Sequence, residues 1–197
     1  MATLRESMTQ GTSWNDFKAV TWLGQTFTPS ENFLVYSVKL NLYRIGSGIG
    51  TLTLGIRAVD GENKPVAPDL DSGTMAADGV TTNTSGAWYE ILIGGAILLV
   101  SGTRYGITAR TSGGDSNNFL QGHYSGTDYY ADGQGFRSGD SGSTWSTHGQ
   151  DWNFEVWGNT PPSSAVVKKL RRVSVADIVR VNKVPIASMK KYNKVAL

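Results

Sequence analysis

The chain has 197 residues, with 24 glycines, no cysteine and 17% charged residues. Few charges and many glycines disfavour helical bundles and coiled coils and favour short strands joined by tight turns. The lack of cysteine excludes disulfides, Cys-ligated metal centres and thiol nucleophiles, and the presence of only two histidines, His123 and His148, excludes a three-His metal site.

Several segments alternate apolar and polar residues with a period of two, which is typical of strands that bury one face. Residues 37–43, for example, place Val38, Leu40 and Leu42 on one side. The predicted strands, in chain order, are residues 21–27, 37–43, 51–58, 88–93, 104–110, 118–124 and 152–156. The glycine-rich residues 46–50 join two of them and predict a hairpin. The expected fold is an all-β, antiparallel two-sheet jelly-roll sandwich.

Charge divides the chain into two parts. Residues 1–164 hold 9 Lys/Arg and 15 Asp/Glu, about −6, whereas residues 165–197 hold 9 Lys/Arg and one acid, Asp177, about +8. The Gly/Pro/Ser-rich stretch before the basic part reads as a linker. The predicted organisation is an N-terminal arm at residues 1–9, a sandwich at 10–158, a linker at 159–164 and a basic tail at 165–197.

Spaced blocks of the sandwich resemble a known module. They combine aromatics with strand residues and are Trp22-x-x-Gln25-x-Phe27-Thr28-Pro29, the strand ending at Tyr43, Gly50-Thr51-Leu52-Thr53-Leu54, Trp88-Tyr89-Glu90, Gly102-Thr103-x-Tyr105-x-Ile107 and Asp151-Trp152-x-Phe154-Glu155-Val156-Trp157-Gly158. Together they resemble the jelly-roll module, similar to carbohydrate-binding modules, of phage and viral tail or fibre proteins and of some microbial surface proteins. The resemblance covers about residues 10–158 and implies a virion or surface context without a named ligand.

One motif in the sandwich is sharply defined. Ser138, Asp140, Gly142, Thr144 and Trp145 fit the pattern S-x-D-x-G-x-T-W, which is similar to the Asp-box hairpins of sialidase propellers. An aspartate in such a loop can accept backbone N–H groups, and glycine permits a positive φ. Propellers repeat the box, whereas this chain has one copy, so we interpret it as a structural hairpin and assign no catalytic residue.

Two groups of residues are candidates for binding. Tyr rings can stack on sugar faces or form protein interfaces, and His and Asp can hydrogen-bond hydroxyl groups. The candidate ligand-binding residues on this basis are His123, Tyr124, Asp128, Tyr129 and Tyr130; the competing interpretation is that these rings cover the end of the sandwich.

Acidic loops supply the second group. Hard oxygen ligands suit calcium, and the candidate calcium ligands are Asp60, Glu62, Asp69 and Asp71. The 12-residue EF-hand pattern is missing, and solvated turn acids explain the same residues. No other cofactor is expected.

The tail repeats with a period of 11, and its apolar residues recur at positions 1, 4, 7 and 9. Pro185 and the excess of β-branched residues argue against a helix, so each unit is interpreted as strand, Asn-Lys turn, strand. The tail resembles the I-K-K-V-N-G-V repeats that end many phage virion proteins, with Lys183 and Lys194 in place of the usual Gly. The predicted assembly or anchoring residues are Val167, Leu170, Val173, Val175, Ile178, Val181, Val184, Ile186, Met189, Tyr192, Val195 and Leu197.

The composition of the tail also bears on partners. DNA-binding arms are normally polar, whereas 18 of the 33 tail residues are apolar or Tyr. This favours docking on a protein partner or self-association, with a trimer preferred, over nucleic acid. Intramolecular packing on the acidic sandwich is an alternative.

The expected location of the protein follows from two further features. Residues 1–7 lack the apolar core of a signal peptide, and the longest apolar stretch is too short to cross a bilayer, so we expect neither secretory export nor a membrane. Phage virion proteins assemble in the host cytoplasm and combine such features with an extracellular type of sandwich. The sequence therefore predicts a non-enzymatic phage virion protein: a head or tail fibre, or a capsid decoration. The alternatives are a glycan-binding, or less favourably glycan-cleaving, module of a microbial surface protein, and a basic-tailed nucleic-acid binder.

Overall fold

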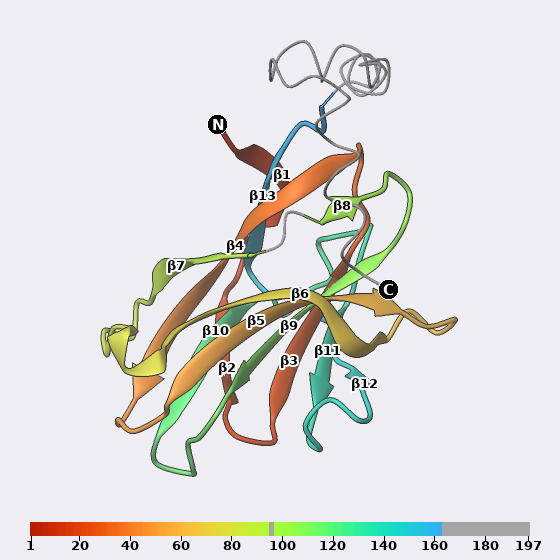
Figure 1. The fold of residues 1–197 in the computed structure, drawn as a ribbon. Coiled ribbons are helices and arrows are strands. Elements are labelled where there is room, and N and C mark those ends of the chain that lie inside the picture. The colour runs from red at the N-terminus through yellow and green to blue at the C-terminus, as the bar shows by residue number, and fades with distance from the viewer. Residues whose placement is uncertain (95–96, 163–197) are drawn as a thin grey trace, which may run out of the picture. The chain divides into compact units, whose positions relative to one another are not determined.

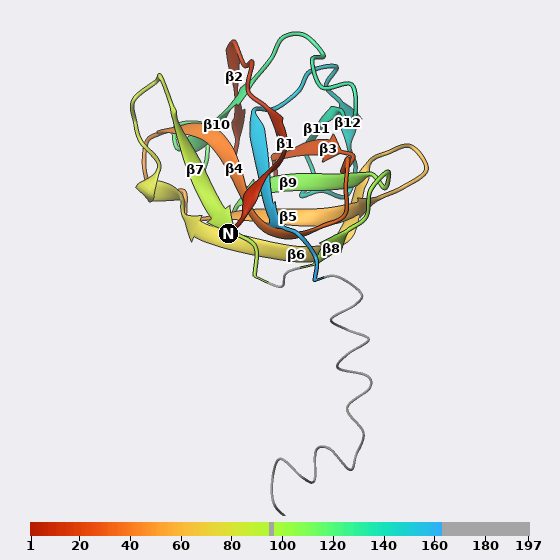
Figure 2. The same ribbon diagram turned by 90° about the horizontal axis from the view of Figure 1, so that it is seen from above.

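A computed structural model describes residues 1–94 and 97–162, and the predicted tail with its anchoring residues lies outside the described residues. The chain separates into two units after Thr160. The first unit consists of two antiparallel β-sheets packed face to face, which Figures 1 and 2 show as two layers. Among the described residues, no helix has the length and apolar character needed to cross a membrane.

The seven-stranded sheet is built around one long central strand, β4. Its main order is β1-β13-β4-β10-β2, and β7 and β8 also pair with β4. The strands are β1 (Thr3–Met8), β2 (Ser13–Phe17), β4 (Phe33–Ile45), β7 (Ala87–Leu92), β8 (Leu98–Leu99), β10 (Phe119–Tyr124) and β13 (Phe154–Asn159).

The opposing six-stranded sheet has the order β12-β11-β3-β9-β5-β6. Its strands are β3 (Trp22–Phe27), β5 (Thr51–Val59), β6 (Pro65–Ala76), β9 (Tyr105–Thr111), β11 (Gly135–Ser138) and β12 (Ser146–Thr147), and a short 3₁₀ turn, η1 (Ala77–Gly79), follows β6. The chain passes repeatedly from one sheet to the other, as in a jelly roll.

The hydrophobic core lies between the two sheets because each strand turns its apolar side inward. Along β4, Leu42 is fully buried while Asn41 on the other side is partly exposed. Phe27 and Phe154 meet across the core with ring centroids 6.2 Å apart. The expected all-β two-sheet sandwich is therefore confirmed, and each of the seven predicted strands overlaps a strand of the structure.

Three expectations need correction. Residues 1–9 form no free arm, because β1 pairs with β13 and Met8 enters the core. Residues 46–50 form no hairpin, since they carry the chain from β4 in one sheet to β5 in the other. Asn159, assigned to the linker, is the last residue of β13.

The strands that the sequence did not predict are mostly short or at the edges of the sheets. The longest of them, β6, is an edge strand whose residues alternate between half-buried and exposed along most of its length. An edge strand is fixed by backbone hydrogen bonds to a single neighbour and has little apolar surface to bury. Its sequence, rich in Asp, Gly and Pro, therefore resembles a loop.

Candidate functional site

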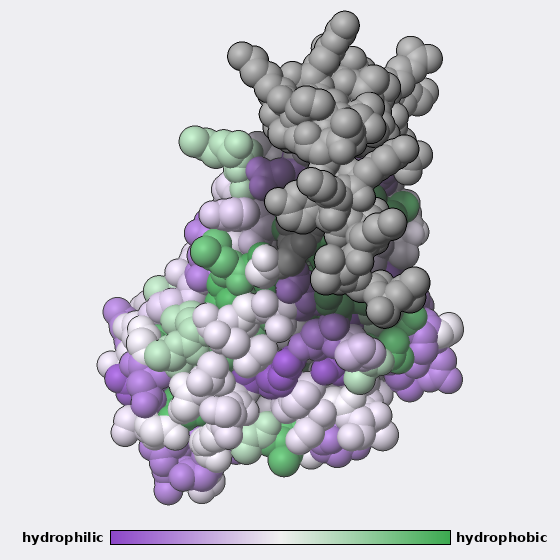
Figure 3. All heavy atoms as spheres, in the orientation of Figure 1, coloured by the Kyte–Doolittle hydropathy of each residue, from purple (hydrophilic) through white to green (hydrophobic). Residues whose placement is uncertain are grey.

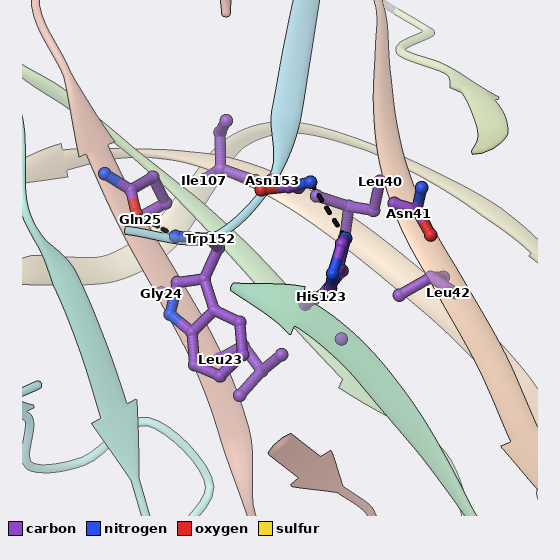
Figure 4. A pocket seen from close by; sticks show the side chains of 12 residues that line it. Leu23, Gly24, Gln25, Leu40, Asn41, Leu42, Ile107, His123, Trp152 and Asn153 are labelled. Atoms are coloured by element: carbon purple, nitrogen blue, oxygen red, sulfur yellow. Dashed lines mark hydrogen bonds between the residues drawn. The ribbon is translucent and has the colours of Figure 1, made fainter. Parts of the chain in front are cut away.

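The seven-stranded sheet forks beside the middle of β4. On one edge of β4, β13 pairs with residues 34–40 and β10 with residues 42–45, while β7 occupies the other edge. The gap opens onto a cavity lined by Leu23, Leu40, Ile107, His123 and Trp152 among others (Figure 4). The space open to the centre of a water molecule is only about 10 Å³. That is room for about one water, so the fork is not a pocket for a sugar or cofactor.

His123 lies at the mouth of this fork and is held by neighbouring side chains. The side-chain amide nitrogen of Asn153 lies 3.0 Å from Nδ1 of His123 (Figure 4). The indole of Trp14 stacks on the imidazole at 4.2 Å between centroids. Burial lowers the pKa of His123, which keeps the ring neutral near pH 7.

The loop that follows β10 is organised by one buried aspartate, Asp151, which is 1% exposed. Its Oδ2 accepts the backbone N–H groups of Tyr129 and Tyr130 at 2.9 and 2.8 Å, and its Oδ1 accepts from Nε2 of Gln25 at 2.9 Å. Burial raises the pKa of Asp151, and these hydrogen bonds partly oppose the rise. Asp151 therefore fixes the position of the tyrosine loop.

The five candidate ligand-binding residues have different surroundings. Tyr130 packs edge-on against Phe154, and its hydroxyl donates to Glu6 over 3.0 Å. Tyr124 makes edge contacts with His148 and Trp152. Only Asp128 and Tyr129 are exposed, the latter by 56%. His123, Tyr124 and Tyr130 thus pack against neighbouring side chains of the sandwich.

The Asp-box forms the loop of the β11–β12 hairpin. Asp140 Oδ1 accepts the backbone N–H of Thr144 at 2.9 Å and the hydroxyl of Ser138 at 2.8 Å, and Oδ2 accepts the Thr144 hydroxyl at 2.7 Å. Gly142 has φ +78°, a left-handed conformation that suits glycine. The hydrogen bonds from Thr144 and Ser138 lower the pKa of Asp140 to about 2.

The Asp-box hairpin packs on the outside of the six-stranded sheet. Trp145 is buried against Gly24 of β3, where a Cβ atom would come within 3.0 Å of the indole. Ser141 donates its backbone N–H to the carbonyl of Val20 at 2.8 Å. The loop therefore anchors the turn that leads into β3, which agrees with a structural role for the box.

The calcium hypothesis fails at Asp69. This residue lies on β6, and its two carboxylate oxygens accept from Nε of Arg57 at 2.6 Å and Nη2 of Arg110 at 2.5 Å. A carboxylate neutralised by two guanidinium groups is a poor cation ligand. Asp60 accepts the backbone N–H groups of Glu62 and Lys64 within its own turn, and Glu62 pairs with Lys64.

The remaining candidate, Asp71, also lies on β6, where its carboxylate accepts the backbone N–H of Ser72. Over residues 1–94 and 97–162, no group of three or more His, Asp or Glu side chains is arranged to hold a metal ion.

The sequence did not predict the groove that lies beside Asp69 and its two arginine partners. It runs over the outer side of the six-stranded sheet, has a volume of about 430 Å³ and is lined by Ala19, Val20, Trp22, Thr53, Arg110, Thr111, Ser112 and Ser141. The surface over β5 and β6 is largely pale or hydrophilic in Figure 3. No sequence pattern indicated this site, because the two arginines and one aspartate that meet here are distant from one another in sequence.

A second groove lies on the other sheet. Its lining includes Tyr36, Lys39, Glu90 and Trp157, and its volume is about 490 Å³. Its charged groups already have partners: Lys39 lies 4.2 Å from the Trp157 ring centroid and 3.7 Å from Glu155, and Glu90 accepts from Ser37. The groove on the six-stranded sheet is the better candidate for a charged ligand, because Nη1 of Arg110, which lines it, has no hydrogen-bond partner among the described residues.

The chain matches no protein-family model and no curated protein at a significant level.

Proposed function

We propose that this chain is a non-enzymatic structural protein of a phage virion, a head or tail fibre or a capsid decoration, whose sandwich is exposed for surface adhesion. The observation that carries the proposal is the division of the chain. A sandwich with an excess of acidic residues ends at Thr160, and a basic, apolar 11-residue repeat follows.

The sandwich supports this proposal by being self-contained. Its first strand, β1, pairs with its last, β13, and the aromatic core is closed between the sheets. A module built in this way closes its hydrophobic core within a single chain. It can therefore be displayed at the end of a short linker.

The repeat supports the anchoring half of the proposal. More than half of its residues are apolar or Tyr, and an isolated hairpin of that length is marginal in water. A partner surface or a symmetric bundle, with a trimer preferred, would cover the apolar positions. The basic positions would then face solvent or an acidic partner.

Three acidic groups that lie near aromatic residues have structural partners, which fits the proposal that the chain is not an enzyme. A glycoside hydrolase needs two carboxyl groups free to act on either side of the sugar. Glu155 accepts from the Trp157 indole at 2.8 Å, Asp151 holds a loop, and Asp140 holds the Asp-box. These three carboxyl groups, each close to aromatic residues, are already committed to structural contacts.

The test is deletion of residues 165–197. We expect residues 1–164 to remain folded and monomeric in light scattering, whereas the full chain forms oligomers or attaches to its assembly. Because apolar contacts are not screened by salt, attachment of the full chain should survive about 0.5 M salt. V184D or I186D should release it, while the matched charge change K183A should have little effect. A truncated chain that assembles as the full chain does would refute the proposal.

A further inference from the structure

Two arginines and one aspartate share a small volume on the outer side of the six-stranded sheet. Asp69 of β6 bridges Arg57 of β5 and Arg110 of β9, with both ion pairs at 2.5–2.6 Å. The three side chains are 13%, 7% and 22% exposed, respectively. The cluster therefore holds two positive charges and one negative charge where solvent screens them poorly.

Trp22 completes the cluster from β3. The guanidinium carbons of Arg57 and Arg110 lie 5.3 and 4.9 Å from the centroid of its ring. Its indole Nε1 donates to the carbonyl of Ala19 at 3.0 Å, which holds the ring in place. Cation–π contact partly compensates the unbalanced charge but does not neutralise it.

Of the two guanidinium groups, only that of Arg110 lines the groove. Its Nη2 donates to Asp69, while Nη1 is enclosed and has no hydrogen-bond acceptor among the described protein groups. Buried donors are normally paired, and this nitrogen is one of eight buried side-chain N or O atoms of the described residues that have no partner. A ligand oxyanion that reached this nitrogen would supply the missing acceptor.

The rest of the groove is suited to a ligand that is rich in hydroxyl groups. Thr53, Ser112 and Ser141 bring polar atoms to its walls, and Trp22 and Val20 bring apolar surface. The Asp-box loop fixes one wall, because Gly142 lies so close to Trp22 that a Cβ atom there would be 2.7 Å from the ring. Such a mixture of aromatic surface, hydroxyl groups and a guanidinium group complements a sugar that carries a carboxylate.

We propose that the groove beside Arg110 binds an acidic sugar, with the sugar carboxylate paired to Arg110 and its ring against Trp22 and the hydroxyl-bearing residues. This deepens the proposed adhesion role by naming a ligand class. It also holds for the sandwich whether or not the chain belongs to a virion.

Calorimetric titration of the full chain with glucuronic acid and galacturonic acid tests the proposal, with glucose and galactose as neutral counterparts. We expect saturable binding of the acidic sugars only. R110Q should weaken it by about tenfold or more, because it removes the charged partner. R104Q removes the same charge just before the same strand, outside the groove, and should change affinity by less than about twofold, as expected of a distant surface charge. Because the basic tail is identical in all variants, its background binding cancels.

A second variant keeps the test independent of folding. T53V removes one hydroxyl from the groove without changing charge, and it should weaken binding by about threefold to tenfold, the value of one hydrogen bond. Equal losses in R104Q and R110Q would overturn the proposal, as would a failure of the wild-type chain to bind either acidic sugar at 10 mM, roughly the limit for a weak site. Free sulfate that binds as tightly as the acidic sugars would overturn the assignment to a sugar.

The outcome is distinguishable from that of the tail deletion. Sugar titration reports on the sandwich, whereas deletion of residues 165–197 reports on assembly. Either proposal can be refuted by its own experiment while the other stands.

Discussion

Two loops of the sandwich are each held by the carboxylate of an aspartate, which is buried in one case and exposed in the other. In the loop at residues 125–130, the carboxylate of the buried Asp151 accepts two backbone N–H groups. In the loop at residues 138–145, the exposed carboxylate of Asp140 accepts one backbone N–H group and two hydroxyl groups. The comparison separates the effect of hydrogen bonding from the effect of burial.

The two pKa shifts go in opposite directions. Hydrogen bonds lower the pKa of Asp140 from 3.8 to about 2, since little desolvation opposes them. Burial raises the pKa of Asp151 in spite of comparable hydrogen bonds. Three hydrogen-bond donors therefore favour the charged carboxylate at the surface, whereas desolvation outweighs three donors inside.

The largest effect should come from D151A. Removing this carboxylate leaves the N–H groups of Tyr129 and Tyr130 without their acceptor and takes from the Gln25 amide one of its two acceptors. We expect a loss of about 2–4 kcal/mol in the free energy of unfolding, measured by denaturant titration.

D128A is the matched control, because Asp128 lies in the same loop but is exposed. Its effect should stay within about 0.5 kcal/mol. Equal losses in the two variants would show that burial does not distinguish these carboxylates.

Y130F should have an intermediate effect. It removes the hydroxyl that donates to Glu6 over 3.0 Å but keeps the ring against Phe154. The expected loss is about 0.5–1.5 kcal/mol in the same titration. The neighbouring variant Y129F alters a ring that is 56% exposed and should be neutral. A neutral Y130F would mean that the contact between this loop and β1 contributes nothing to stability.

The effect expected from D140A depends on pH. The folded-state pKa of Asp140 is depressed, so its stabilisation is fully present above pH 4 and is lost as the pH falls through about 2. The melting temperature of D140A should therefore lie below that of the wild type at pH 7 and converge on it near pH 2. A gap between the two melting temperatures that is constant from pH 7 to pH 2 would contradict this account.

The sequence determined the fold class and most of the interior. Alternation in segments such as residues 37–43 predicted strands, because a side chain that must be buried leaves a period-two signal. The Asp-box was also readable, since the hydrogen bonds of Ser138 and Asp140 that shape the loop connect residues within four positions of one another.

Only the tertiary structure decided the rest. The sheet pairing of β1 and β6 depends on a neighbour's backbone, which leaves little trace in the side chains of an edge strand. The groove beside Arg110 depends on residues from β3, β5, β6 and β9 that meet because of strand order. From the sequence, Asp69 was a candidate calcium ligand because it is an acid in a polar segment. In the structure it pairs with two arginines, because the sheet places β6 next to β5 and β5 next to β9.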